Sequence, residues 1–546
     1  MSDLTIEKFC SYVAPDLWHT DQFLTWPPDV FALVASLLLK SGAYCYAVSG
    51  WKRSEANREW VKNMRTLGKD WRSKLIPPPQ VLSWRQAIID NKTVAVFEVR
   101  QHEELCKALL SLVAAADEAC RGVGCTVSSD DTDRFLGEAS QLLQISAKTL
   151  DVSTLCKLVD HSVVRVLPKL HTPQSGITIR SLTHHLALCP AGDVRAKWAE
   201  RPHPKNPTPR YCLNLLLAPW PVTVSPSHFR NVKPTDAELL NMPKRFGFFE
   251  YDPPEPPPGS YDVAQRIETM IKNACQVVDR IDGVVFPEIS LTEAEYKRVS
   301  AVLMPRGIFL ICGVREAPES ENRAGKNYLR FDIPVDIEQV TNQAASSGGE
   351  FFSHSQGKHH RWRLEKRQIV QYGLGSCLDL EWNWWEHISI DKRELYFVVL
   401  EDWLTVCALI CEDLARQDPV SEIVRAVGPN LVIALLMDGP QLTQRWPARY
   451  ATVLADDPGS SVLTLTSVGM SELSRPPSIQ KRSRAVALWK DAKTGDAVTI
   501  ELPPNTDGVV LSLSREREKE YSADGRDDGG IGGYPTLSGI HYVTFS

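Results

Sequence analysis

Residues 408–413 read Ala-Leu-Ile-Cys-Glu-Asp, so an apolar run stops abruptly at Cys411. A second apolar run, residues 283–286, stops in the same way at Pro287 and Glu288. Short continuous apolar runs are typical of buried strands in α/β proteins. Because such strands place their ends in a crevice at the carboxyl edge of the sheet, we expect Glu288 and Cys411 to meet in a ligand site.

A lysine between these two segments is expected to complete the site. Lys366 begins the stretch Lys-Arg-Gln-Ile-Val-Gln-Tyr-Gly, and Lys358 competes with it from a position beside His359 and His360. We favour Lys366 because of the Ile-Val-x-Tyr-Gly pattern that follows it. A carboxylate, an amine and a thiol in one crevice are the groups needed for acyl transfer through a covalent thioester.

The three segments, in this order, resemble motifs of the nitrilase (carbon–nitrogen hydrolase) superfamily. Residues 286–288 (Phe-Pro-Glu) resemble its strand end, residues 366–373 its lysine followed by an apolar stretch and an aromatic-Gly, and residues 410–413 (Ile-Cys-Glu-Asp) its nucleophile elbow. The resemblance implies an α/β fold, a nitrilase-like α-β-β-α sandwich. Flanking segments agree with it, namely residues 213–218, 311–314, 327–328 and 448–469.

The resemblance also implies a role for each residue. Cys411 is the expected nucleophile, Glu288 the general base, and Lys366 the positive charge that stabilises the oxyanion. The backbone N–H of Glu412 is the expected second oxyanion donor, with Asp413 beside it as an orienting residue. A free thiol has a pKa near 8.5, so it needs such a base at neutral pH, and burial is expected to raise the pKa of Glu288. This chemistry requires no metal and no organic cofactor.

One position departs from the family pattern. The aromatic-Gly after the lysine is commonly followed by a second glutamate that orients the site, and this chain has Leu374 there. A leucine accepts no hydrogen bond, so either Glu381 or Glu386 from the following segment is a candidate replacement. The departure keeps open a catalytically impaired protein on a nitrilase fold.

Two functions therefore remain in view from the sequence. The first is a thiol-dependent amidohydrolase that cleaves a non-peptide C–N bond of a small molecule, in an amide, a carbamoyl amine or a nitrile. The alternative is a nitrilase-fold assembly or scaffold protein, or one associated with bacterial antiviral defence. The resemblance implies a homo-oligomer, dimeric or larger, in either case.

Bulk composition describes an ordinary globular chain. Its 546 residues are 43% hydrophobic and 23% charged, with a formal net charge of −6, so no general basic field favours nucleic acid for this chain alone. Thirteen cysteines without a Cys-x-x-Cys pair fit reduced thiols in the cytoplasm and favour no metal site. No secretory signal is recognisable, and the apolar run 30–39 is half the roughly twenty residues of a membrane-spanning helix.

Composition also suggests four segments. Residues 1–200 are expected to be a mostly helical accessory domain, with helices at 30–39, 103–116 and 134–146. Residues 201–210 are a Pro-rich linker, residues 211–515 the hydrolase domain, and residues 516–546 a charged, Gly-rich flexible arm whose end pairs with a partner subunit.

Overall fold

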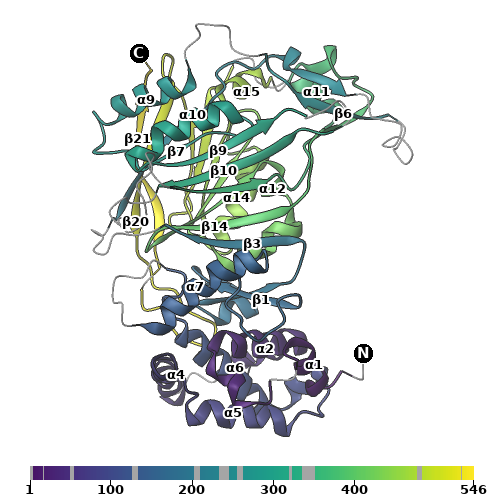
Figure 1. Cartoon of the computed structure of the whole chain (residues 1–546), viewed down its shortest axis with the longest axis vertical. Coiled ribbons are helices and arrows are strands. Elements are labelled where there is room, and N and C mark those ends of the chain that lie inside the picture. Colours follow the sequence, from purple (N-terminus) through teal and green to yellow (C-terminus); the bar gives the residue numbers. More distant parts are fainter. Residues whose placement is uncertain are drawn as a thin grey trace.

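The structure is a computed structural model of the whole chain (Figure 1). It describes residues 4–15, 18–49, 55–125, 133–201, 210–232, 245–254, 262–318, 323–334, 351–475, 482–530 and 532–545.

Helices dominate the N-terminal region, as predicted, and gather at one end of the molecule (Figure 1). The expected helix at 30–39 is the middle of α2, which begins at two prolines in its first turn and ends at Gly42, whose φ is 71°. Side chains on every face of α2 are buried, which explains its long apolar run. No helix in the described part of the chain is both long and apolar enough to cross a membrane. The helices are α1 (Ile6–Val13), α2 (Pro27–Ser41), α3 (Tyr46–Ser49), α4 (Glu55–Lys74), α5 (Pro79–Asp90), α6 (Glu103–Ala119) and α7 (Arg134–Thr149).

Two mixed sheets form the body of the protein. The first has the order β11-β10-β9-β7-β4-β20-β21, and the second β19-β18-β17-β16-β15-β14-β3. The first contains β4 (Cys212–Leu217), β7 (Gly283–Val285), β9 (Phe309–Glu316), β10 (Lys326–Pro334), β11 (Phe351–Gly357), β20 (Gly508–Glu516) and β21 (Tyr534–Val543), with β8 (Leu291–Thr292) beside β9. The second contains β3 (Val194–Glu200), β14 (Arg393–Glu401), β15 (Leu404–Ile410), β16 (Leu431–Leu435), β17 (Ser461–Leu465), β18 (Ala485–Lys490) and β19 (Ala497–Glu501).

The layers follow from side-chain alternation along the strands. Leu215 and Leu217 of β4 belong to the hydrophobic cluster that includes Phe397 of β14 in the other sheet. Leu216, which points to the opposite face, packs in a second cluster with Ile267 of α9 (Val263–Ala274) and with α10 (Glu293–Leu303). Helix α14 (Trp446–Asp456) packs on β17 and β18 of the second sheet. The prediction of an α-β-β-α sandwich is therefore confirmed.

A small third sheet covers the edge where the strands β7 and β15 end. Its order is β12-β13-β6-β5, and its strands come from segments more than a hundred residues apart. Trp384 of this sheet, Ile289 and Met437 share a hydrophobic cluster, so the sheet packs directly over the ends of the central strands. The elements here are β5 (Phe229–Val232), β6 (Phe246–Tyr251), β12 (Arg363–Leu364), β13 (Asn383–Glu386), α11 (Lys366–Gln371), α12 (Glu412–Ala415), α13 (Glu422–Val427) and α15 (Val468–Leu473).

The segment boundaries need two corrections. Strand β3, within the expected accessory domain, pairs with β14 and forms the edge of the second sheet, whereas β1 (Val164–Pro168) and β2 (Leu186–Pro190) pair with each other. The expected flexible arm is instead ordered: β21 pairs with β20 of the same chain, and Glu520 and Arg526 are buried. Most of the predicted linker, residues 202–209, lies outside the described residues.

Candidate active site

Glu288 lies at the turn that follows β7, at the edge of the first sheet. Its carboxylate accepts three hydrogen bonds: Oε1 lies 2.7 Å from Lys358 Nζ and 2.8 Å from Asn327 Nδ2, and Oε2 lies 2.7 Å from the backbone N of Met437. Burial raises the pKa of Glu288, and the neighbouring Glu386 raises it further, although Lys358 opposes both effects. The site therefore holds a base that gains basicity from its surroundings.

The backbone at Glu288 is held in an unusual conformation. Ile289 has a φ of 43°, a value that a β-branched residue rarely adopts. Gly313 of β9 lies against this turn, and a Cβ there would come within 2.5 Å of the Glu288 Cα and the Pro287 carbonyl oxygen. The Ser290 hydroxyl closes the turn by donating to the same Pro287 carbonyl at 2.8 Å. Only glycine at 313 permits this approach, which fixes Glu288 against the sheet edge.

Lys358 follows the last residue of β11 and is fully buried. Its Nζ lies between two carboxylates, 2.7 Å from Glu288 and 2.5 Å from Glu386. Burial disfavours the charged amine, but the charges of Glu288 and Glu386 raise the Lys358 pKa well above its usual value. The amine is therefore held as an ammonium ion in a buried position.

Glu386, at the end of β13, is the second carboxylate of the site. It accepts from the backbone N of Trp362 at 3.0 Å and from Asn327 Nδ2 at 2.8 Å. Leu374, at the position where the family pattern has a glutamate, is buried in the hydrophobic cluster of the small sheet. The structure thus brings Glu386, one of the two candidate replacements, to Lys358.

Cys411 directly follows β15 and is the N-cap residue of the short helix α12. Its φ and ψ of 45° and −105° are strained for a non-glycine residue, and such strain is common where a reactive side chain is presented. The thiol is 3% exposed. Burial and the Glu288 charge raise its pKa well above the usual value, whereas Lys358 and the N–H of Met437 oppose this. Cys411 therefore shares one electrostatic environment with Glu288 and Lys358, and at neutral pH it is a thiol that requires a base.

The two residues after Cys411 differ in their surroundings. The Glu412 side chain pairs near the surface with Arg416 at 3.0 Å. The Asp413 carboxylate is buried and accepts from the backbone N of His359 at 3.1 Å and from His360 Nδ1 at 2.9 Å. Asp413 consequently connects the cysteine turn with the segment that carries Lys358.

The structure does not bring Lys366 to this cluster. Lys366 begins α11 with a side chain that is 64% exposed and pairs with Glu381 on the surface at 2.6 Å. The apolar pattern that favoured it belongs to the packing of α11, because Ile369 and Tyr372 are buried while the lysine faces outward. The predicted position of Lys366 is therefore wrong, and the competing residue Lys358 occupies the site. Lys358 directly follows β11, but that strand has no continuous apolar run that marks its end in the sequence.

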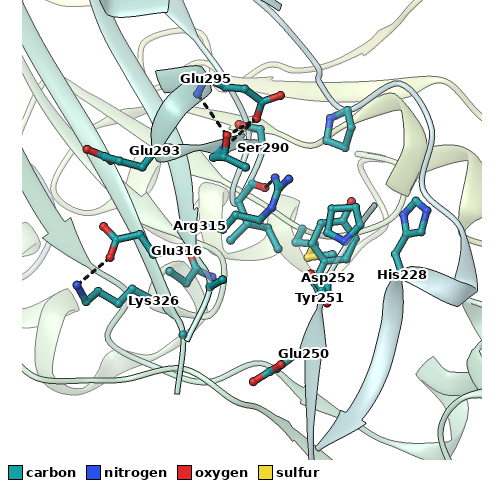
Figure 2. A pocket seen from close by; sticks show the side chains of 18 of the residues that line it. His228, Glu250, Tyr251, Asp252, Ser290, Glu293, Glu295, Arg315, Glu316 and Lys326 are labelled. Carbon is teal, nitrogen blue, oxygen red and sulfur yellow. Dashed lines mark hydrogen bonds and ion pairs between the residues drawn. The ribbon is translucent and has the colours of Figure 1, made fainter. Parts of the chain in front are cut away.

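A cleft of about 1320 Å³ opens onto the site from the side of the small sheet. Asn327, Glu386 and Met437, which each bond to Glu288 or Lys358, are among the residues that line it. Figure 2 shows the cleft from close by, with Arg315 and Tyr251 near each other and Glu316 paired with Lys326. A small molecule in this cleft reaches polar groups of the site directly. Among the described residues, no group of three or more His, Cys, Asp or Glu side chains is placed to hold a metal ion.

Comparisons with known proteins give a likeness of fold. No family model and no curated protein matches the sequence. Among solved structures, Saccharomyces cerevisiae Nit3, a member of branch 10 of the nitrilase superfamily, is 11% identical with a TM-score of 0.32, over 56% of this chain and 90% of that chain. An amidase from Nesterenkonia sp. is 10% identical with a TM-score of 0.30, over 55% and 90%. XC1258 from Xanthomonas campestris, a CN-hydrolase superfamily protein, is 12% identical with a TM-score of 0.29, over 56% and 90%.

Proposed function

We propose that this protein is a carbon–nitrogen hydrolase that cleaves an amide through a thioester on Cys411. The observation that carries the proposal is the buried contact between Glu288 and Lys358, which are 2.7 Å apart and whose charges both act on the pKa of Cys411. Asn327 and Glu386, which bond to this pair, line the cleft. A buried ion pair is expensive to maintain for stability alone, and perturbed groups that meet in a cleft are candidates for catalysis.

The groups present account for each step of such a reaction. Cys411 Sγ attacks the amide carbon while Glu288 takes the thiol proton, and the Lys358 ammonium stabilises the oxyanion that forms. The C–N bond then breaks as Glu288 returns that proton to the leaving amine. Water, deprotonated by Glu288, hydrolyses the thioester and releases the acid and the free thiol. The backbone N–H of Glu412, directly after the nucleophile, is the proposed second oxyanion donor.

Glu386 has a positioning role in this proposal. It pairs with the Lys358 ammonium in addition to Glu288 and is itself fixed by Trp362 and Asn327. This arrangement keeps the ammonium ordered when the proton of Cys411 neutralises Glu288. The second carboxylate missing at Leu374 is thus supplied from another strand, which favours a catalytic protein over an impaired one.

Asn327 favours an amide over a nitrile as the substrate. Its Nδ2 donates to both Glu288 and Glu386, which fixes the orientation of the side-chain amide. The buried Oδ1 has no hydrogen-bond partner within the described residues, although Asn327 lines the cleft. An unpaired buried acceptor suits a ligand with an N–H group, which an amide or a carbamoyl amine offers and a nitrile lacks.

Trapping the acyl group provides the test. Wild-type protein is incubated with a panel of small primary amides and hydroxylamine, and both ammonia release and hydroxamate formation are measured, with intact mass spectrometry for the thioester. We expect turnover by wild type, no adduct and no turnover with Cys411→Ala, and wild-type behaviour for Cys377→Ala, which removes a half-buried thiol outside the site. An adduct that survives in Cys411→Ala, or no turnover of any amide, contradicts the proposal.

A further inference from the structure

The cleft contains three hydrogen-bond donors that no acidic side chain satisfies within the part of the chain that the structure describes. We propose that the substrate carries a carboxylate in addition to its scissile amide, and that Arg315, Tyr251 and His228 bind this carboxylate. The inference deepens the proposed function, on which it rests, by naming the substrate class.

Arg315 is the central member of this group. It lies at the end of β9, its Nη1 donates to the Ile289 carbonyl oxygen at 3.1 Å, and its guanidinium lies 5.9 Å from the centre of the Tyr251 ring. Within the described residues it has no ion pair with a carboxylate. Other cations that line the cleft do: Arg230 pairs with Glu250 at 2.8 Å, Arg298 with Asp262 at 3.2 Å and Lys326 with Glu316 at 2.8 Å. Arg315 thus retains donors for a ligand.

Tyr251 supplies the second donor. Its hydroxyl oxygen is buried and has no hydrogen-bond partner among the described residues, while the residue lines the cleft. Burial raises the pKa of Tyr251 to about 12, so the hydroxyl keeps its proton at neutral pH. A buried hydroxyl without a partner is uncommon in folded proteins, and a bound ligand would satisfy it.

His228 supplies the third donor from the edge of the small sheet. Its Nδ1 accepts the backbone N–H of Ser225 at 3.3 Å, so in the neutral ring the proton is on Nε2. Burial, together with the nearby Arg315 charge, lowers the pKa of His228, which favours the neutral form. Its ring centre lies 6.1 Å from that of Tyr251, and all three side chains lie in the same part of the cleft (Figure 2).

The position of this group relative to the reaction centre limits the substrate. Arg315 binds the carbonyl of Ile289, which directly follows Glu288, so a carboxylate on Arg315 lies within a short chain of the scissile amide. Glu250, Asp252 and Glu316 line the same cleft, where Glu250 and Asp252 share Arg230 and Glu316 pairs with Lys326. Among the described residues that line the cleft, one positive charge without a carboxylate partner matches a singly charged carboxylate, whereas a doubly charged phosphate retains an unbalanced charge near these acids.

Matched pairs of amides test the inference. Succinamate and glutaramate are compared with butyramide and valeramide, which have similar length but no second acid. In the wild type we expect kcat/KM to favour the acidic amides by about 10²-fold, because a site built for a hydrogen-bonding group rejects analogues that lack it. Arg315→Met should remove this preference, mainly by raising KM for the acidic amides. Tyr251→Phe should reduce the preference in part, and Arg298→Met, which removes a cleft cation already paired with Asp262, should preserve it.

A binding measurement separates this inference from the proposed function. Glutarate is titrated calorimetrically into Cys411→Ala protein, with and without Arg315→Met, and inorganic phosphate serves as the competing anion. Glutarate binding that requires Arg315 supports the carboxylate site even if no amide is hydrolysed. Neutral amides hydrolysed as well as acidic ones, or phosphate bound more tightly than glutarate, overturns the inference and leaves the proposed amide hydrolysis standing.

Discussion

Asp413 and His359 connect two of the chain segments that meet at the site. The buried Asp413 carboxylate accepts the backbone N–H of His359 at 3.1 Å, and His359 directly follows Lys358. Asp413 lies two residues beyond Cys411, so this contact relates the thiol to the ammonium through the backbone of two strands in different sheets. The distance between Cys411, the proposed nucleophile, and the Lys358 ammonium therefore depends on the contact that Asp413 makes.

We expect Asp413→Ala to impair both stability and activity. The substitution leaves the buried His359 N–H without its acceptor, which costs about 1–3 kcal/mol in the free energy of unfolding. Loss of the contact also loosens the position of Lys358, and because a misplaced catalytic group lowers the rate, kcat should fall by at least about tenfold. Urea unfolding and amide turnover measure the two effects. The control is Asp402→Ala, which removes an exposed acid in the turn before β15. Equal effects of the two substitutions would contradict the positioning role of Asp413.

The choice between the two lysines gives the second prediction. Lys358→Met should reduce kcat by about 10²–10³-fold, the size of effect reported for loss of one oxyanion donor. It also leaves Glu288 and Glu386 buried without their cation, at a cost of about 3–5 kcal/mol in the free energy of unfolding. Lys366→Met should change neither quantity, because Lys366 is exposed and pairs only on the surface.

A double variant tests the role of Lys358 even if Lys358→Met alone does not fold. Lys358→Met with Glu386→Gln removes one buried charge of each sign, so it should recover part of the stability while remaining inactive. Activity retained by either variant that lacks Lys358, or lost with Lys366→Met, would refute the assignment of Lys358.

The sequence identified the site where a buried strand with a continuous apolar run ends in a reactive side chain. This pattern held for Glu288 after β7 and for Cys411 after β15, both of which lie at such ends. It failed for Lys358, because β11 is an edge strand with two exposed phenylalanines and the polar sequence Ser-His-Ser-Gln, so it has no apolar run. Lys366 had a clearer local pattern, but that pattern reflects how α11 packs.

Contacts between segments far apart in the chain could not be predicted from the sequence either. Asp527 to Gly530 read as a flexible stretch by composition, yet Arg526 beside it bonds to Asp117, 409 residues earlier in the chain. Local composition does not report such a partner. The sandwich was predicted from the resemblance of three short motifs to a known family, and each of these motifs is local to one segment of the chain.

The pH dependence of hydrolysis should report the ionisation of Glu288. Glu288 acts as a base only when ionised, so kcat/KM should rise with pH through its pKa, which burial raises above the ordinary value. The Glu386 charge raises this pKa too. Glu386→Gln removes that charge, and the rising limb of the profile should therefore move to lower pH, even if the maximum rate falls. Glu381→Gln, at the surface, should leave the limb in place; a shift to higher pH with Glu386→Gln, or no shift, would count against Glu288 as the base.

The buried Arg526 should prove essential to the attachment of the N-terminal helices. Its guanidinium is fully buried and contacts Asp117 at 2.9 Å, Glu118 at 3.1 Å and Asp524 at 3.0 Å. Arg526→Met leaves these carboxylates without their cation, so we expect a loss of about 3–5 kcal/mol in the free energy of unfolding at pH 7. Arg517→Met, an exposed cation on the same segment, should stay within about 0.5 kcal/mol of wild type.

Lowering the pH should reduce the loss in the free energy of unfolding that Arg526→Met causes. Despite burial, which raises the pKa of Asp117, Arg526 and the nearby histidines hold it at about 2, below the unfolded value of 3.8. In the wild type this carboxylate therefore stabilises the fold above pH 3.8, and the contribution is lost as pH falls toward 2. Without Arg526 the pKa of Asp117 rises, so acid protonates Asp117 and removes its buried charge. The difference in the free energy of unfolding between Arg526→Met and wild type should therefore be smaller at pH 4 than at pH 7. Urea unfolding at both values measures this change, and a difference that stays constant or widens would show that the guanidinium does not act through Asp117.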